Sequence, residues 1–284
     1  MEENDERKVE EAVLNLSRSH RALAPLALVV GAFVLLFSAL RLLVSNWRLT
    51  LVQVLPAMWI WIAMFDLKAH ALHGKSFHVL RGPVLIPIAL GFVAITIAAF
   101  FLNGVFAFAI ARDGRPEIRP AVAEARRHWT PIIVSGAVVG LMLAFATTVV
   151  TRWGKPWFGL SLSVVIGVMM ISYITVPARL IGIKPTGSPR DRLSASVVAG
   201  ALSAAVCTPP YLLGRVGILM LGSKVLLIPG IFVFAIGITL QAGATGAVRA
   251  IKLSAKLLTG QEGAAPDGTA QAGAPQAGAA APQA

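Results

Sequence analysis

A carboxylate and two imidazoles stand at helical spacing just after an apolar run of this sequence. Asp66, His70 and His73 occupy positions i, i+4 and i+7, so on a helix the three side chains share one face. One carboxylate with two imidazoles is a typical ligand set for zinc or iron, and it leaves coordination positions open for water or substrate. The same residues also fit a polar turn at the level of lipid phosphates. Both interpretations stay open on the sequence alone.

A second candidate is Arg215, a charge within an apolar stretch that also holds Pro209-Pro210. Two consecutive prolines remove backbone donors and predict a broken helix at membrane depth, which would expose backbone groups to a ligand. A charge inside a membrane segment indicates a functional site, here one for an anionic ligand. The alternative is a proline kink, with the Arg215 side chain reaching outward to the lipid headgroups.

Basic residues also gather beside the apolar segments. Arg249, Lys252 and Lys256 follow the last segment at i, i+3 and i+7, which places them on one side of a short helix. Residues 111–130 form a similar arginine-rich stretch, for which we predict another short helix. Cations in such positions attract anionic lipid headgroups, and we expect membrane lipids to be the partners of both stretches.

The composition assigns the whole chain to the membrane. Of its 284 residues 56% are hydrophobic and only 13% charged, whereas about a quarter are charged in an average soluble domain. The apolar residues form long uninterrupted runs, and about 20 such residues cross the hydrocarbon core as a helix. The net charge of +12 resides mainly between these runs, where it directs topology and meets lipid, so it does not indicate nucleic acid.

We therefore predict an all-α, polytopic bundle of transmembrane helices with six or seven spans. Seven hydrophobic segments lie at about 25–44, 50–66, 83–110, 131–151, 158–178, 193–221 and 225–247. The bundle, residues 23–247, follows a charged amphipathic segment, 1–22, and precedes a basic juxtamembrane helix, 248–259, and a tail, 260–284, whose Ala, Gly, Pro and Gln content predicts disorder. Gly136-x3-Gly140 predicts a close helix contact.

The segment at 50–66 is the ambiguous one, because it is short and contains Gln53 and Pro56. It either spans the membrane or is re-entrant. Seven spans with the N-terminus outside place 14 of the 25 Lys and Arg residues in the cytoplasm. A re-entrant 50–66 with the N-terminus inside places 16 there. Both arrangements obey the positive-inside rule, and both put 111–130, 179–192 and the C-terminus in the cytoplasm.

Several kinds of site are missing from the sequence. No acidic residue lies deep within a hydrophobic segment, which argues against a proton- or sodium-coupled carrier built on a membrane carboxylate. The chain has no P-loop, HExxH, GxSxG or Rossmann glycine motif in a suitable context. We accordingly expect a protein without catalytic activity.

Three blocks of the sequence carry a resemblance. Residues 66–75 (DLKAHALHGK), 81–87 (RGPVLIP) and 207–215 (CTPPYLLGR) resemble those of an uncharacterised actinobacterial family of multi-pass membrane proteins, and the likeness covers residues 40–258. This resemblance implies a bacterial plasma membrane and carries no activity.

These observations favour a non-catalytic, lipid-interacting or assembly role in the membrane. The first alternative is a transporter of a lipid or of a small hydrophobic solute, which would use Arg215 and the proline pair. The second is a metal-dependent enzyme that acts on lipid headgroups, with zinc or iron held by Asp66, His70 and His73.

Overall fold

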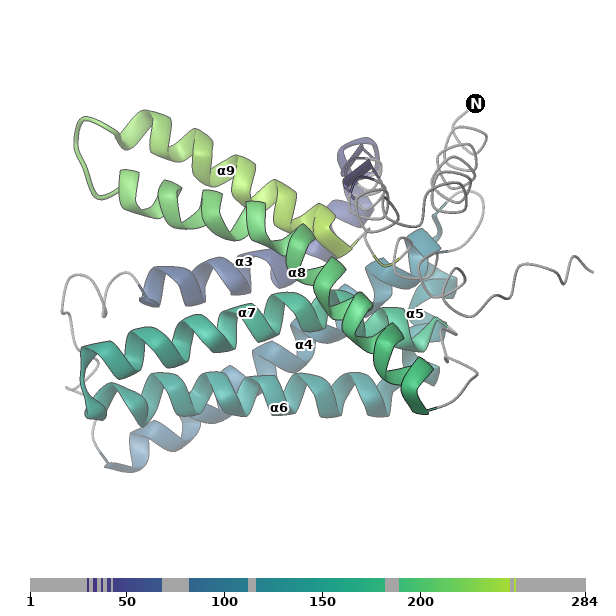
Figure 1. Ribbon diagram of the computed structural model, residues 1–284, viewed down its shortest axis with the longest axis horizontal. Helices are drawn as coiled ribbons and strands as arrows, with labels where there is room; N and C mark the ends of the chain where they lie inside the picture. Colours follow the sequence, from purple (N-terminus) through teal and green to yellow (C-terminus); the bar gives the residue numbers. More distant parts are fainter. Residues whose placement is uncertain are drawn as a thin grey trace, which may run out of the picture.

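The computed structural model describes residues 43–67, 82–111, 116–181 and 189–245, together with residues 30, 33–34, 37, 40–41 and 248. Every regular element in these parts of the chain is a helix, so the predicted all-α class is confirmed. The longer elements are α3 (Trp47–Leu67), α4 (Leu85–Ala111), α5 (Ile118–Arg127), α6 (Trp129–Thr148), α7 (Lys155–Leu180), α8 (Pro189–Met220) and α9 (Leu227–Ala244) (Figure 1). Two 3₁₀ turns, η4 (Gly82–Val84) and η5 (Val150–Trp153), precede α4 and α7.

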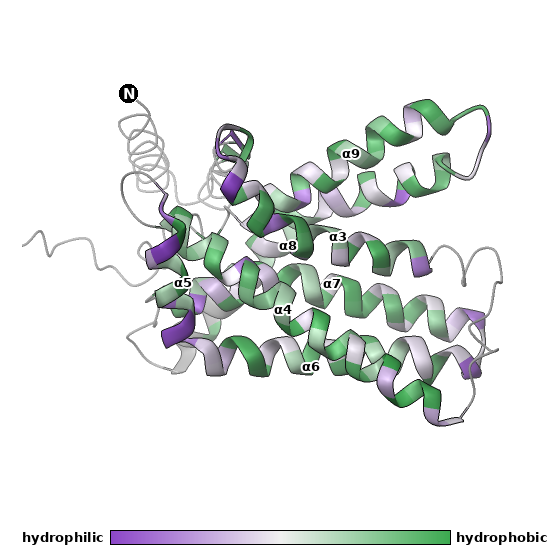
Figure 2. Cartoon of the chain, turned by 180° about the vertical axis from the view of Figure 1, so that it is seen from behind, coloured by the Kyte–Doolittle hydropathy of each residue, from purple (hydrophilic) through white to green (hydrophobic). Residues whose placement is uncertain are grey.

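Six of the described helices, α3, α4 and α6 to α9, are long and apolar enough to cross a membrane. They correspond one by one to the last six predicted hydrophobic segments, and Figure 2 shows many apolar residues in these helices. The first segment, 25–44, lies mostly outside the described residues, as do the stretches 1–22, 249–259 and 260–284. The structure thus supports a multi-pass membrane protein.

The ambiguous segment at 50–66 is part of α3, a continuous helix of 21 residues with Pro56 inside it. At about 1.5 Å per residue such a helix extends about 30 Å, which is the thickness of the hydrocarbon core. Its geometry therefore favours the spanning alternative over the re-entrant one.

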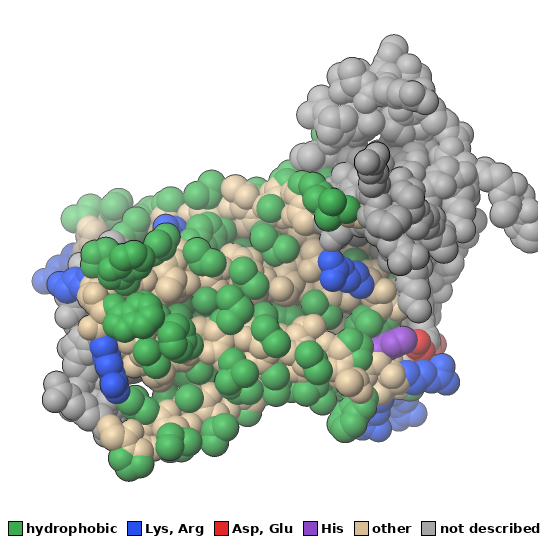
Figure 3. All heavy atoms as spheres, turned by 60° about the horizontal axis from the view of Figure 1, so that its bottom comes forward, with side chains coloured by type: hydrophobic (Ala, Val, Ile, Leu, Met, Phe, Trp, Pro, Cys, Tyr) green, Lys and Arg blue, Asp and Glu red, His purple; other side chains and the backbone are tan. Residues whose placement is uncertain are grey.

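Consecutive spans run in opposite directions, so the bundle has two distinct ends (Figure 1). The α5 end holds α5, the start of α6 and α8, and the end of α4 and α7. The opposite end holds the end of α3, the start of α4, the turn between α6 and α7 and the turn between α8 and α9. On the face seen in Figure 3, hydrophobic side chains cover the middle, while Lys and Arg gather toward the two ends. That distribution is typical of a surface surrounded by lipid.

The predicted glycine contact joins α6 to α4. A Cβ atom on Gly136 would lie 2.9 Å from Ile97 Cα, and one on Gly140 would lie 2.8 Å from Val93 Cα. Real side chains cannot approach a backbone so closely, so only glycine permits these two helices to pack at this distance. The prediction made from Gly136-x3-Gly140 is confirmed.

A tryptophan joins α3 to the α8–α9 pair. The Trp61 side chain is only 1% exposed, and its ring meets that of Phe234 edge-on at 4.9 Å. A Cβ atom on Gly214 would overlap the indole, and one on Gly237 would lie 2.9 Å from it. The two glycines therefore form the notch that receives Trp61.

The predicted break at Pro209-Pro210 is wrong. Both prolines lie inside α8, which continues as one helix from Pro189 to Met220, although Figure 1 shows it changing direction along its length. Two prolines remove two backbone hydrogen bonds and bend a helix. Unwinding it would free further N–H and C=O groups where no water satisfies them. A bend is therefore the less costly response at membrane depth.

Candidate functional site

The structure describes two of the predicted site residues, Asp66 and Arg215. The other five, His70, His73, Arg249, Lys252 and Lys256, lie outside the described residues. Within the described part of the chain, no group of three or more His, Cys, Asp or Glu side chains is close enough to hold a metal ion. The zinc or iron set stays a prediction, because two of its three ligands are not among the residues searched.

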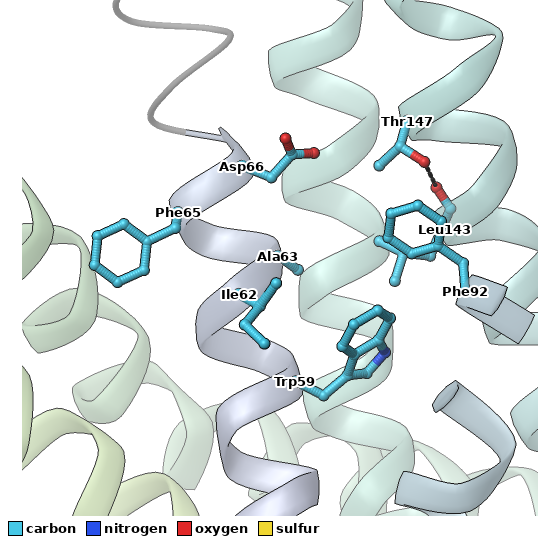
Figure 4. A pocket seen from close by; sticks show the side chains of 8 residues that line it. All are labelled: Trp59, Ile62, Ala63, Phe65, Asp66, Phe92, Leu143 and Thr147. Carbon is cyan, nitrogen blue, oxygen red and sulfur yellow. Dashed lines mark hydrogen bonds between the residues drawn. The ribbon is translucent and has the colours of Figure 1, made fainter. Parts of the chain in front are cut away.

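Asp66 belongs to the wall of a cavity of about 350 Å³ between α3, α4 and α6. Its lining residues are Trp59, Ile62, Ala63, Phe65, Asp66, Phe92, Leu143 and Thr147 (Figure 4). In Figure 4 the Asp66 carboxylate and the Thr147 hydroxyl lie toward one end of the cavity, and the Trp59 indole lies toward the other. Asp66 is the penultimate residue of α3, so its end of the cavity is the one nearer the membrane surface.

Helical spacing explains how these side chains meet. Trp59, Ile62, Ala63 and Asp66 stand at i, i+3, i+4 and i+7 on α3, which is one stripe of a helix surface. Leu143 and Thr147 form a shorter stripe, one turn apart on α6. The small side chain of Ala63 at the centre of the longer stripe leaves room between the helices.

The polar atoms around the cavity are mostly occupied by bonds of their own. The Trp59 indole donates to Thr96 Oγ1 at 2.9 Å, and Thr96 in turn donates to the carbonyl of Phe92 at 2.6 Å. The Thr147 hydroxyl donates to the carbonyl of Leu143 at 2.9 Å. Because the hydroxyl and indole groups of the wall already have hydrogen-bond partners within the protein, a ligand in the cavity would meet mainly hydrocarbon. Asp66 is the one lining residue with a formal charge.

Arg215 lies on a different face, between α8 and α7. Its side chain is exposed, and Nη2 donates to Ser163 Oγ at 2.8 Å. The guanidinium carbon also lies 4.9 Å from the centre of the Tyr211 ring, a typical cation–π geometry. The Ser163 hydroxyl donates onward to the carbonyl of Gly159 at 2.6 Å.

A buried network of neutral side chains was not predicted from the sequence. Gln53 Nε2 lies 3.2 Å from Asn103 Oδ1 and 3.2 Å from Thr245 Oγ1, and it donates to the carbonyl of Ala242 at 3.1 Å. Thr245 donates to Asn103 Oδ1 at 2.7 Å, and Asn103 donates to the carbonyl of Tyr173 at 2.6 Å. The network joins α3, α4, α7 and the end of α9. Gln53 and Asn103 interrupt apolar runs, and that interruption was the available signal.

No protein-family model matches the chain, and neither a curated protein nor a solved structure is detectably similar to it.

Proposed function

We propose that this protein is a non-catalytic, lipid-interacting protein of a bacterial plasma membrane, and that it binds the apolar part of an amphiphile between α3, α4 and α6. The observation that carries the proposal is the cavity of about 350 Å³ with its almost wholly apolar lining. Binding sites for small molecules are typically concavities of about 300–1,000 Å³ with mainly apolar walls and few polar groups. The ligand's chemistry follows from that lining: a hydrocarbon chain or a small hydrophobic body.

The position of Asp66 supports an amphiphile over a wholly apolar solute. Asp66 lies at the end of α3, where the hydrocarbon core gives way to headgroups, and the rest of the α3 stripe lies deeper. A ligand with its apolar portion beside Ala63 and Leu143 would bring a polar head to the level of the Asp66 carboxylate. Lipids have that shape, and the surrounding membrane supplies them.

The cavity can be filled by mutation. Ala63 is only 6% exposed and lines it, so Ala63→Phe should occupy the space and exclude the ligand. Val138→Phe is the matched control, because Val138 is 52% exposed on α6 and the added ring enters surrounding lipid. The measurement is native mass spectrometry of gently extracted full-length protein, with helix content and gel filtration as checks of folding. A folded Ala63→Phe protein that retains the wild-type set of bound lipids and solutes would contradict the proposal.

We also propose that the α5 end faces the cytoplasm. The loops at that end, 111–130 and 179–192, contain five and four Lys or Arg residues. The loops 67–82, 149–157 and 221–226 at the opposite end contain three, two and one. Cytoplasmic loops carry the excess of Lys and Arg, and this difference does not depend on how the first hydrophobic segment lies.

A C-terminal reporter fusion tests this orientation, since α9 ends at the α5 end. A reporter that is active only in the cytoplasm should be active. Activity of an enzyme that functions only outside the membrane, fused at the same position, would reverse the assignment.

A further inference from the structure

The Arg215 side chain extends back along α8, toward the middle of the part of this helix that is long and apolar enough to span a membrane. Tyr211 precedes Arg215 by one helical turn on α8 and is therefore nearer the middle of the span. The guanidinium lies over the Tyr211 ring, 4.9 Å from its centre. An arginine that reaches for the nearer headgroups would extend the other way, toward the end of α8 at Met220.

The hydrogen bond from Arg215 to Ser163 on the neighbouring helix α7 also holds the guanidinium away from the end of the bundle. Ser163 follows Lys155, the first residue of α7, by eight positions, which corresponds to about 12 Å along a helix at 1.5 Å per residue. The guanidinium donates to Ser163 Oγ at 2.8 Å. The charge is thus held about two turns below the start of α7.

Both groups that hold the guanidinium are neutral, a hydroxyl and an aromatic ring. The ion pairs found among the described residues involve Glu124, at the α5 end, and none of them includes Arg215. A guanidinium has five N–H donors, and one of them meets Ser163. An exposed cation at this depth is costly in hydrocarbon, and an anion that accepts from the remaining donors would remove that cost.

The surroundings of Arg215 indicate which anion. On α8 the side chains of Leu212, Val216 and Leu219 are exposed, and on α7 those of Leu160 and Val164 are exposed. These apolar groups require hydrocarbon as their neighbour. A phospholipid supplies acyl chains for them and a phosphate for the guanidinium, and arginine is well suited to phosphate because its donors are planar and paired.

We propose that Arg215, held by Tyr211 and Ser163, binds the phosphate of an anionic phospholipid in the leaflet at the opposite end of the bundle. The headgroup is drawn inward between α7 and α8, and the acyl chains lie along the exposed side chains of both helices. Lys155 shares a face of α7 with Ser163, two turns nearer the surface, and it meets the outer part of the same headgroup. This site is separate from the cavity beside Ala63.

The test compares two lipids with identical acyl chains, phosphatidylglycerol and phosphatidylcholine, on full-length protein in mixed micelles. Native mass spectrometry counts the lipids retained at each ratio. Wild-type protein should prefer phosphatidylglycerol, and Arg215→Gln should lower this preference about fivefold, the factor expected for one cation that meets an anionic lipid. Arg152→Gln should leave it unchanged, because Arg152 is a basic residue at the same end in η5, outside the α7–α8 contact.

Each of the remaining outcomes also tests the proposal. Equal preference in wild type and in a folded Arg215→Gln protein overturns the proposal. If Arg215→Gln fails to fold, Ser163→Ala replaces it: that variant keeps the charge and loses the acceptor, and an unchanged preference again overturns the proposal. Loss of the wild-type preference on adding inorganic phosphate at the concentration of the lipid would assign the site to a soluble anion instead.

Discussion

The two halves of the bundle are held together by different interactions. Toward the α5 end, Gln53, Asn103 and Thr245 form a closed set of hydrogen bonds that reaches α7 through the carbonyl of Tyr173. Toward the opposite end Trp61 is seated by shape against Gly214 and Gly237, and the hydrogen bonds between helices there, Trp59 to Thr96 and Arg215 to Ser163, are isolated ones. Neutral amides and a hydroxyl join four helices in one half, and a single indole joins three in the other.

The two halves therefore differ in role: one mainly stabilises the fold, and the other contains the proposed binding sites. The amides of the first half are buried and point at one another, so they contribute mainly to which helices are neighbours. The second half contains the cavity beside Ala63, with Asp66 at its end, and the exposed Arg215. We infer that substitutions in the first half change stability and leave ligand binding alone. Substitutions of the charged residues in the second half should change ligand binding and leave stability alone.

The largest effect is expected at the glycine notch that receives Trp61. Gly214→Ala places a methyl group where the Trp61 indole lies, and overpacking of this kind costs about 3 kcal/mol. Gly200→Ala on the same helix is the control, because a Cβ atom there meets nothing within 4 Å. Unfolding titrations in mixed micelles measure both free energies. Equal stability of the two variants would show that Trp61 does not depend on the glycine notch.

The next largest effect is expected in the hydrogen-bonded half. Asn103→Leu removes the bond to the Tyr173 carbonyl and the two that Asn103 Oδ1 accepts. At about 0.6 kcal/mol for each bond within a membrane, the loss is about 2 kcal/mol. Thr208→Val is the control, since the Thr208 hydroxyl is exposed and bonds only to the carbonyl of Ala204 one turn earlier. Native mass spectrometry should find the bound lipids of both variants unchanged. Loss of lipid from a folded Asn103→Leu protein would contradict the proposal that this half contributes to stability and not to ligand binding.

Local patterns predicted the helices well, because the thickness of the bilayer sets their length. The segment predicted at 158–178 is α7, Lys155–Leu180, and the one at 131–151 is α6 with η5. The Gly136-x3-Gly140 notch was also readable, since its two residues lie one turn apart on one helix. The stripe from Trp59 to Asp66 has the same property, because residues seven positions apart lie on one face of a helix.

Contacts between distant helices could not be predicted in this way. Gln53 and Thr245 are 192 positions apart, and nothing in the spacing of either residue says that α3 and α9 are neighbours. Gln53 in isolation suggested a re-entrant segment, whereas its partners make it an interior residue of a span. The notch of Gly214 and Gly237 could not be predicted for the same reason, because it depends on Trp61 of another helix.

The metal prediction concerns Asp66, the acidic residue that lines the cavity in the opposite half. If Asp66, His70 and His73 bind zinc or iron, protein purified without chelator should contain nearly one equivalent of metal by elemental analysis. His70→Ala and His73→Ala should each lose most of it, and Asp66→Asn should lower it while α3 remains folded. Trace metal that does not change in the double histidine variant would assign this stretch to the membrane surface, with Asp66 serving the cavity alone.

The smallest effect is expected in the predicted juxtamembrane helix, 248–259. Arg249, Lys252 and Lys256 share one side of the predicted juxtamembrane helix, and each should contribute about 1 kcal/mol of attraction to anionic lipid. A peptide of residues 246–259 with Lys252→Gln should therefore bind anionic vesicles about fivefold more weakly than the native peptide. The difference should shrink at high salt, because salt screens exposed charges. Lys252→Arg keeps the charge and is the control. Equal binding of the native and Lys252→Gln peptides at low salt would mean that this helix meets the membrane without help from these cations, which would leave Arg215 as the stronger proposed lipid contact.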